Sequence, residues 1–135
     1  MKVLIVDDII ENRLALFHFL KKTATCDLAE NGIFALSQFK SAHEKGEPYD
    51  LILLDLMMPE MDGIECLGEI RSQEEDMGAE DEEDRSKVVI ITALDDRDQI
   101  KRAFDAGCNE YLVKPVLKAN LTKLLSKLFP DTEFK

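Results

Sequence analysis

Five polar residues at four sites, each site directly after a short apolar run, could do chemistry together: Asp7 with Asp8, Asp55, Thr92 and Lys114. Carboxylates that lie close together repel, so at neutral pH they need either a shared proton or a bound cation. Aspartate oxygens are ligands of the kind that Mg²⁺ takes, and a lysine ammonium can offset the charge of a phosphate oxygen. A carboxylate beside a metal and a lysine can act as a nucleophile in phosphoryl transfer. The residue types therefore predict phosphorylation of Asp55, provided that the five side chains meet.

The apolar runs before these side chains must position them. The runs are 3–6, 51–54, 88–91 and 111–113. Short apolar runs rich in aliphatic residues predict buried strands of a parallel sheet. The carboxyl ends of neighbouring parallel strands share one edge, which is where open α/β folds bind ligands. We therefore expect all five side chains at a single edge of one sheet.

Strand and helix patterns alternate along the rest of the chain. Strands are expected at about 2–6, 24–29, 50–55, 88–92 and 109–113, and helices near 10–22, 32–45, 63–72, 95–106 and 116–129. Asp62 is a good N-cap for the helix over 63–72. Five units of this kind imply right-handed crossovers and a sheet that is covered on both faces.

Taken singly, each polar residue has an ordinary structural explanation. Asp7 and Asp8 favour a helix cap, and Asp55 precedes a proline-containing turn. Thr92 alone would be a strand-end hydroxyl, and Lys114 a solvated lysine. Only their joint placement after four strands favours the chemical interpretation.

Charge and composition limit the classes of function. The chain has 135 residues, of which 45% are hydrophobic, enough for one globular domain. The net charge is −11, but segment 74–84 carries eight acids and no base; outside it, 20 acids face 17 bases, or −3. No basic stripe suggests nucleic-acid binding, and no apolar stretch approaches the roughly 20 residues that span a bilayer. The three cysteines form no C-x-x-C pair, and no signal peptide is recognisable, so a cytoplasmic protein with reduced thiols is expected.

The acidic segment interrupts the predicted domain. We expect one domain over 1–130 with an acidic loop insertion at about 72–87, and a short polar tail over 131–135. A solvated, disordered segment is the favoured interpretation of 74–84, and a partner contact is the alternative.

Four motifs carry a close resemblance to a known family: VLIVDD (3–8), LILLDLMMPEMDG (51–63), VVIITA (88–93) and YLVKP (111–115). The chain resembles the receiver domain of two-component response regulators, including single-domain chemotaxis receivers, over all but the acidic loop. The resemblance implies a flavodoxin-like α/β fold: a doubly wound, five-stranded parallel sheet in strand order 2-1-3-4-5, with five helices. Periodicity alone does not supply that strand order.

The resemblance also implies a metal site. Asp55 matches the phosphoacceptor, Asp8 a direct Mg²⁺ ligand, and Asp7 a ligand that acts mainly through water. The backbone carbonyl of Met57 matches the third protein ligand. The implied cofactor is Mg²⁺, or Mn²⁺ in its place.

Four further residues match the family's transfer and switch positions. Lys114 is similar to the lysine that pairs with the phosphoryl group, and Pro115 to the proline that follows it through a cis bond. Thr92 and Tyr111 match a switch pair in which the hydroxyl turns toward the phosphoryl oxygens and the ring moves into the space left behind.

The implied function is a phosphorylation-activated signalling switch. Asp55 would accept a phosphoryl group from a sensor histidine kinase or a histidine phosphotransfer protein. Output would pass through the surface of helix 95–106, strand 109–113 and helix 116–129, which could also form a dimer. The downstream protein target is not indicated, and neither nucleic acid nor a membrane is expected as a partner.

Two alternatives stay open beside this function. A receiver that works without phosphorylation is disfavoured because no motif residue is missing. A Mg²⁺-dependent phosphohydrolase is disfavoured because Met57 stands where a second acid or base is expected, so the chain is not expected to be an enzyme. Met57 and Leu94 occupy the positions that tune acyl-phosphate hydrolysis in the family, and neither can orient a water. Slow self-dephosphorylation is therefore predicted.

Overall fold

Strands and helices alternate along the chain, as the sequence predicts. The computed structural model describes residues 1–135. The strands are β1 (Lys2–Val6), β2 (Thr25–Ala29), β3 (Leu51–Leu54), β4 (Lys87–Thr92) and β5 (Glu110–Val113). The helices are α1 (Ile10–Leu20), α2 (Gly32–Glu44), α3 (Gly63–Asp76), α4 (Arg97–Asp105), α5 (Lys118–Leu128) and the short 3₁₀ helix η1 (Glu82–Asp84).

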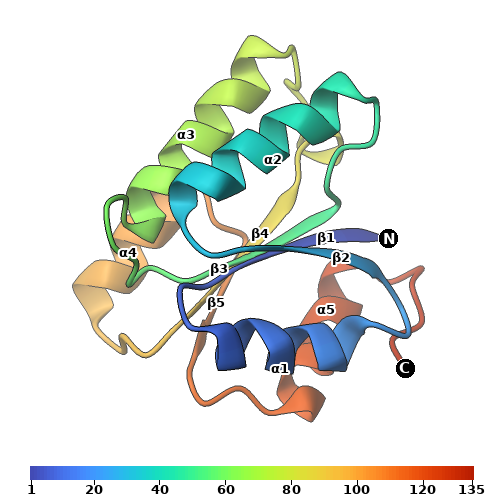
Figure 1. The fold of residues 1–135 in the computed structure, drawn as a ribbon, viewed down its shortest axis with the longest axis vertical. Helices are drawn as coiled ribbons and strands as arrows, with labels where there is room; N and C mark the ends of the chain where they lie inside the picture. Colours follow the sequence, from blue (N-terminus) through green and yellow to red (C-terminus); the bar gives the residue numbers. More distant parts are fainter.

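The five strands form one parallel sheet in the order β2-β1-β3-β4-β5, which confirms the predicted flavodoxin-like topology (Figure 1). Val6 at the end of β1 lies opposite Leu54 at the end of β3, and Leu54 lies opposite Ile90 of β4. Thr92 at the end of β4 lies opposite Val113 of β5. This register brings the residues that follow β1, β3, β4 and β5 to one edge of the sheet.

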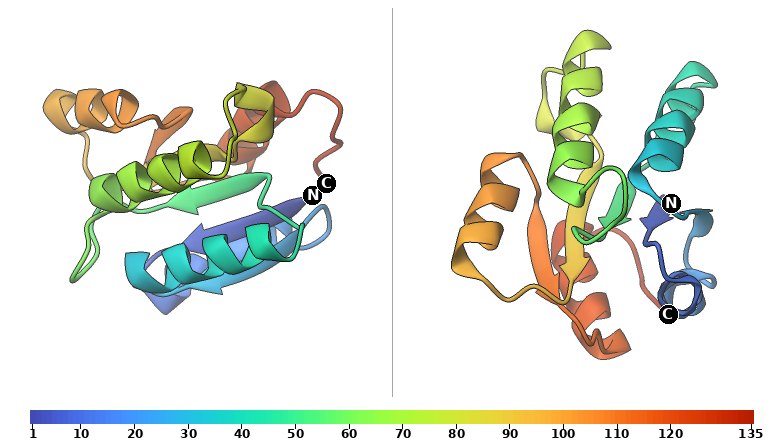
Figure 2. Two further views of the ribbon diagram at one scale, coloured as in Figure 1. Left: turned by 90° about the horizontal axis from the view of Figure 1, so that it is seen from above. Right: turned by 60° about the vertical axis from the view of Figure 1, so that its left-hand side comes forward.

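Helices cover both faces of the sheet and divide the core in two. Alternate strand residues point to opposite faces, so Leu4 and Val6 join one cluster and Val3 and Ile5 the other. The first cluster lies under α2, α3 and α4, and the second under α1 and α5 (Figure 2). Each fully buried aliphatic side chain in these layers stabilises the fold by about 1.5–3 kcal/mol. The chain contains no helix long and apolar enough to cross a membrane.

Helix α3 differs from its predicted bounds at the carboxyl end. It starts as expected, where the side chain of Asp62 accepts a hydrogen bond from the backbone N–H of Glu65 at 2.9 Å. It runs on to Asp76, beyond the predicted end at 72. The run of acids predicts a solvated loop here, but glutamate is a good helix former and one of these acids points inward.

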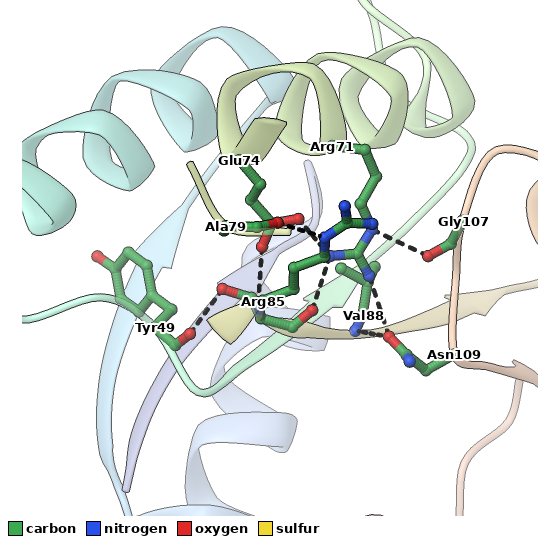
Figure 3. A network of polar contacts seen from close by, with 9 residues as sticks. Tyr49, Arg71, Glu74, Ala79, Arg85, Val88, Gly107 and Asn109 are labelled. Carbon is green, nitrogen blue, oxygen red and sulfur yellow. Dashed lines mark hydrogen bonds and ion pairs between the residues drawn. The ribbon is translucent and has the colours of Figure 1, made fainter. Parts of the chain in front are cut away.

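That inward-pointing acid is Glu74, which is fully buried and forms an ion pair with Arg71. The other Glu74 oxygen accepts a hydrogen bond from the Ser86 backbone N–H at 2.7 Å. Arg71 also donates to the backbone oxygens of Ser86 and Gly107 and to the Asn109 side chain (Figure 3). The network joins the end of α3 to the starts of β4 and β5.

The expectation of a solvated loop over 74–84 is therefore wrong for part of the segment. Glu74 and Ala79 are buried, and residues 82–84 form η1. Arg85 donates to the carbonyl of Ala79 at 2.8 Å and closes the loop between these two residues. The other seven acids of the segment are exposed. The segment leads into the amino end of β4, away from the carboxyl edge of the sheet.

The expected polar tail packs against the domain. The ring of Phe134 lies against the cluster under α1 and α5, and the backbone N–H of Lys135 donates to the Thr23 hydroxyl at 3.0 Å.

Candidate functional site

Three aspartates meet at the carboxyl edge of the sheet. Asp7 and Asp8 follow β1, and Asp55 follows β3. One carboxylate oxygen from each of the three lies within 4.8 Å of the others. Asp7 and Asp55 are 2% and 4% exposed, whereas Asp8 is open to solvent. Two negative charges are thus held where water screens them poorly.

The two buried carboxylates are held in the same way. Oδ1 of Asp7 accepts the backbone N–H of Ile9 at 2.9 Å, and Oδ1 of Asp55 accepts that of Met57 at 3.0 Å. Each bond spans two residues, a turn in which a short aspartate side chain holds its own backbone. One oxygen of each carboxylate is therefore fixed by the loop that follows its strand.

Lys114, which follows β5, bonds the remaining oxygens. Its Nζ lies 2.7 Å from Asp7 Oδ2 and 2.8 Å from Asp55 Oδ2. Partial burial by itself lowers the pKa of Lys114, but hydrogen bonds and charges from Asp55 and Asp7 outweigh burial and raise it above its ordinary value. Three carboxylates and one ammonium leave two uncompensated negative charges, which is the charge of one divalent cation.

Thr92 and Tyr111 contact a shared segment beside this cluster. Thr92 is fully buried, and its Oγ1 accepts the backbone N–H of Leu94 at 3.4 Å. The Tyr111 hydroxyl donates to the Leu94 carbonyl at 2.7 Å. Burial, followed by the charges of Asp95 and Asp96, raises the pKa of Tyr111, so the hydroxyl keeps its proton. Leu94 thus connects both side chains to the loop before α4.

The other residues of the family match lie around the same edge. The Lys114–Pro115 peptide bond is cis. The backbone N–H of Lys114 donates to the Thr92 carbonyl at 2.8 Å, which holds the ends of β4 and β5 together. The Met57 side chain is 54% exposed beside Asp55.

Two residues of the site were not identified from the sequence. A Cβ atom at Gly63 would lie only 2.3 Å from the Asp55 carbonyl oxygen, so only glycine lets α3 start this close to the Asp55 backbone. Arg13 of α1 donates from Nη1 to the backbone carbonyl of Asp7 at 2.6 Å. Neither backbone contact leaves a local pattern in the sequence, so no motif pointed to Gly63 or Arg13.

The fold and site together define a class of protein. It is a doubly wound α/β domain whose carboxyl edge holds an acidic triad, one lysine paired to two of the acids, and a buried hydroxyl. Such a site can bind a hard divalent cation and offers a carboxylate beside it as a phosphoryl acceptor.

Comparisons with known proteins identify the family. The family model for the response regulator receiver domain matches residues 3–126, so the chain belongs to the response regulator receiver domain family. It is 37% identical over 131 residues to chemotaxis protein CheY-3 of Vibrio cholerae, covering 96% of this chain and 92% of that protein.

Longer proteins and solved structures agree with this assignment. The chain is 32% identical to hybrid signal transduction histidine kinase M of Dictyostelium discoideum, over 93% of its own length but only 5% of that protein. Its fold matches the structure of a CheX-CheY-BeF3-Mg²⁺ complex from Borrelia burgdorferi with a TM-score of 0.80 and 26% identity, covering 96% of this chain and 89% of that one. Members of this family are signalling domains of two-component systems.

Proposed function

We propose that this protein is a phosphorylation-activated switch that accepts a phosphoryl group on Asp55. The donor is the phosphohistidine of a sensor kinase or of a phosphotransfer protein. The observation that carries the proposal is the placement of Lys114 Nζ, 2.7 Å from Asp7 and 2.8 Å from Asp55, beside the exposed Asp8. A lysine held in this way faces the position where phosphoryl charge would develop.

In the transfer step, an Asp55 carboxylate oxygen attacks the phosphorus atom of the donor. The new O–P bond forms as the P–N bond to the donor imidazole breaks, and the imidazole nitrogen keeps the electron pair of that bond. Lys114 supports the step by offsetting charge on the transferring oxygens. The hydrogen bond from the Met57 N–H holds the Asp55 carboxylate in place during the attack.

The acidic triad fits a divalent cation. Asp8, Asp7, Asp55 and the backbone carbonyl of Met57 would hold Mg²⁺ or Mn²⁺, which supplies charge neutralisation for the phosphoryl group when bound. The fit rests on two buried carboxylates whose charge a single lysine cannot balance.

The switch is proposed to run through Leu94. A phosphoryl group on Asp55 attracts the Thr92 hydroxyl, which gives up its contact with the Leu94 N–H. Movement of Leu94 then releases the Tyr111 hydroxyl from the Leu94 carbonyl. Helix α4 follows this segment and buries only Ala103, so few core contacts oppose its displacement. The population shifts toward a second packing of α4, β5 and α5, which alters partner binding.

Labelling with the small donor acetyl phosphate tests the proposal. Intact-mass measurement should show one added phosphoryl group in the presence of Mg²⁺, and none when EDTA removes the metal. Asp55→Asn should abolish the label. The matched control is Asp84→Asn, which changes an exposed acid of segment 74–84 and should label like the unchanged protein.

Two results would contradict the proposal. Labelling of Asp55→Asn at the normal rate would place the acceptor elsewhere. An unlabelled protein in Mg²⁺ would support a binding module that works without phosphorylation.

A further inference from the structure

Helix α4 has few core contacts, so the contacts at its two ends determine how firmly it is held. Along its length it buries only Ala103. Its amino end follows Leu94, whose hydrogen bonds the proposed switch breaks. Its carboxyl end is followed by Gly107, whose carbonyl oxygen accepts a hydrogen bond from Nε of Arg71 at 3.0 Å. The contact with Arg71 therefore remains to oppose displacement of the helix.

Arg71 of α3 uses its whole guanidinium group at this end of α4 (Figure 3). Nη2 donates to Asn109 Oδ1 at 3.0 Å, and Nη1 donates to the Ser86 carbonyl at 2.8 Å and pairs with Glu74. The side chain is only 14% exposed. Because a planar guanidinium donates in fixed directions, these contacts together hold it in one position.

Gly107 lies directly against the Arg71 side chain. Its φ is +107°, and a Cβ atom at this position would lie 3.1 Å from Cγ and 3.2 Å from Nε of Arg71. The backbone that leaves α4 therefore runs close to the guanidinium group. Beside this contact, a cavity of about 380 Å³ is lined by residues from 104–109 and from 82–87. Because this region is not closely packed, the hydrogen bonds of Arg71 account for much of the attachment at this end of α4.

We propose that Arg71 is a positioning residue that holds α4 in its present packing and thereby opposes the switch. The inference rests on the proposed function. Displacement of the amino end of α4 turns the helix about its carboxyl end, and this rotation moves the Gly107 carbonyl out of line with Arg71 Nε. Part of the free energy that a phosphoryl group on Asp55 supplies is then used to release this contact. Arg71 thus sets the fraction of unphosphorylated protein that occupies the second packing.

The acidic segment is connected to the switch through the same side chain. Buried Glu74 and the carbonyl of Ser86 both bind Arg71, and they lie toward the amino edge of the sheet, away from Asp55. Substitutions that release Arg71 should therefore change the switch without touching the phosphoacceptor or the residues around it.

Binding of beryllofluoride in saturating Mg²⁺ tests this role. Beryllofluoride is a charged mimic of a phosphoryl group, and the CheX-CheY complex of Borrelia burgdorferi contains it with Mg²⁺. Arg71→Lys keeps a positive charge beside Glu74, but a single ammonium cannot make the same set of hydrogen bonds. Because less free energy is then needed to displace α4, Arg71→Lys should bind beryllofluoride about fivefold more tightly, as measured by NMR titration.

Two control variants separate this effect from a change of side chain or of stability. Arg102→Lys makes the same replacement at an exposed position of α4 and should leave the affinity unchanged. Val3→Ala removes buried methyl groups from the cluster under α1 and α5, on the face of the sheet opposite α4. It lowers stability without releasing the helix, so it should not tighten binding.

Hydrogen exchange of the unchanged protein supplies a test that needs no variant, and it decides the matter if Arg71→Lys does not fold. The backbone N–H groups of Ala106, Gly107 and Cys108 donate to carbonyl oxygens of α4. Loss of the Arg71 contact loosens this end of the helix, so their exchange should become about tenfold faster when beryllofluoride binds. Exchange in β1 should stay the same. Equal protection of the three groups with and without beryllofluoride would overturn the proposal.

The outcomes separate the role of Arg71 from the proposed function. Failure of the unchanged protein to bind beryllofluoride in Mg²⁺ would contradict the proposed function itself. Equal or weaker binding in Arg71→Lys would overturn only the role of Arg71 in opposing the switch. Equal tightening in Val3→Ala would also overturn it, because the effect would then come from a general loss of stability.

Discussion

Asp8 differs from its two neighbours in the triad because it is exposed and has no ion pair with Lys114, which contacts Asp7 and Asp55. Without metal, its charge only repels the other carboxylates. Asp8→Asn should therefore stabilise the metal-free protein, because it removes this repulsion. The gain should be only about 0.5–1 kcal/mol, because solvent screens the charge of an exposed side chain. The same change should weaken Mg²⁺ binding, since one of the proposed metal ligands is lost.

Urea unfolding with EDTA and with saturating Mg²⁺ would measure both effects, with Asp84→Asn as an exposed control. Destabilisation of Asp8→Asn in EDTA would show that Asp8 makes a favourable contact that this interpretation leaves out.

Met57 is expected to influence how water reaches a phosphoryl group on Asp55 if the proposed function holds. Its thioether is a weak acceptor and cannot orient an attacking water, although its side chain is 54% exposed beside Asp55. Met57→Asn should shorten the lifetime of phosphorylated Asp55 several-fold. Decay of the label after removal of acetyl phosphate gives the rate. Met77→Asn is the control and should leave that rate unchanged. If Met57→Asn also leaves the rate unchanged, Met57 is not the cause of slow hydrolysis.

At the scale of elements, two glycines of α3 provide opposite predictions from the same substitution. Gly63→Ala places a Cβ 2.3 Å from the Asp55 carbonyl oxygen and should cost about 1–3 kcal/mol of unfolding free energy. Gly68→Ala meets nothing within 4 Å and should stabilise the helix by about 1 kcal/mol. Urea unfolding of both variants checks the pair. Equal changes in unfolding free energy would mean that α3 can move away from the Asp55 backbone at little cost.

The carboxyl end of α3 depends on a single buried ion pair. Glu74→Gln would leave Arg71 without its carboxylate partner and should lower the unfolding free energy by about 3 kcal/mol. Glu75→Gln changes an exposed neighbour and should have almost no effect. Chemical denaturation distinguishes them. A neutral result for Glu74→Gln would mean that the hydrogen bonds of Arg71 to Ser86, Gly107 and Asn109 hold this region without the charge.

The whole molecule should lose stability at alkaline pH. Burial, followed by the charges of Glu69, Asp62 and Glu65, raises the pKa of Cys66 from 9.0 to about 12, and burial raises that of Cys108 from 9.0 to about 11. As pH rises, the thiols of the unfolded chain lose their protons near their ordinary pKa of 9.0, before those of the folded protein do. The contribution of each thiol to the free energy of unfolding is therefore complete below pH 9.0 and is lost as pH rises toward its pKa in the folded protein. For Cys66 the loss reaches about 2 kcal/mol near pH 10.5.

Urea midpoints at about pH 8 and about pH 10.5 would measure this decline. Cys66→Ala should be less stable at the lower pH but show a smaller decline. An equal decline in the variant would assign the alkaline effect to other groups, such as Lys114, whose raised pKa acts in the same direction at higher pH.

The sequence by itself determined the elements and the edge at which they meet. Buried parallel strands require continuous apolar runs, so the strands could be located from residues such as those of β1 and β3, and the polar residue after each run followed directly. The order of the strands came from the family resemblance, because periodicity within a strand does not depend on which strand lies beside it.

Only the tertiary structure decided which long-range contacts hold the site and the carboxyl end of α3. The acid at position 74 lies in a run of similar acids, and nothing local distinguishes it from its exposed neighbours. Its burial depends on Arg71, which is itself held by Gly107 and Asn109, more than thirty residues away in the chain. The requirement for glycine at position 63 also comes from the fold, because folding places the Asp55 backbone where a side chain at this position would lie. The cost of burying a charge or adding a methyl group depends on partners brought by folding, which no local pattern encodes.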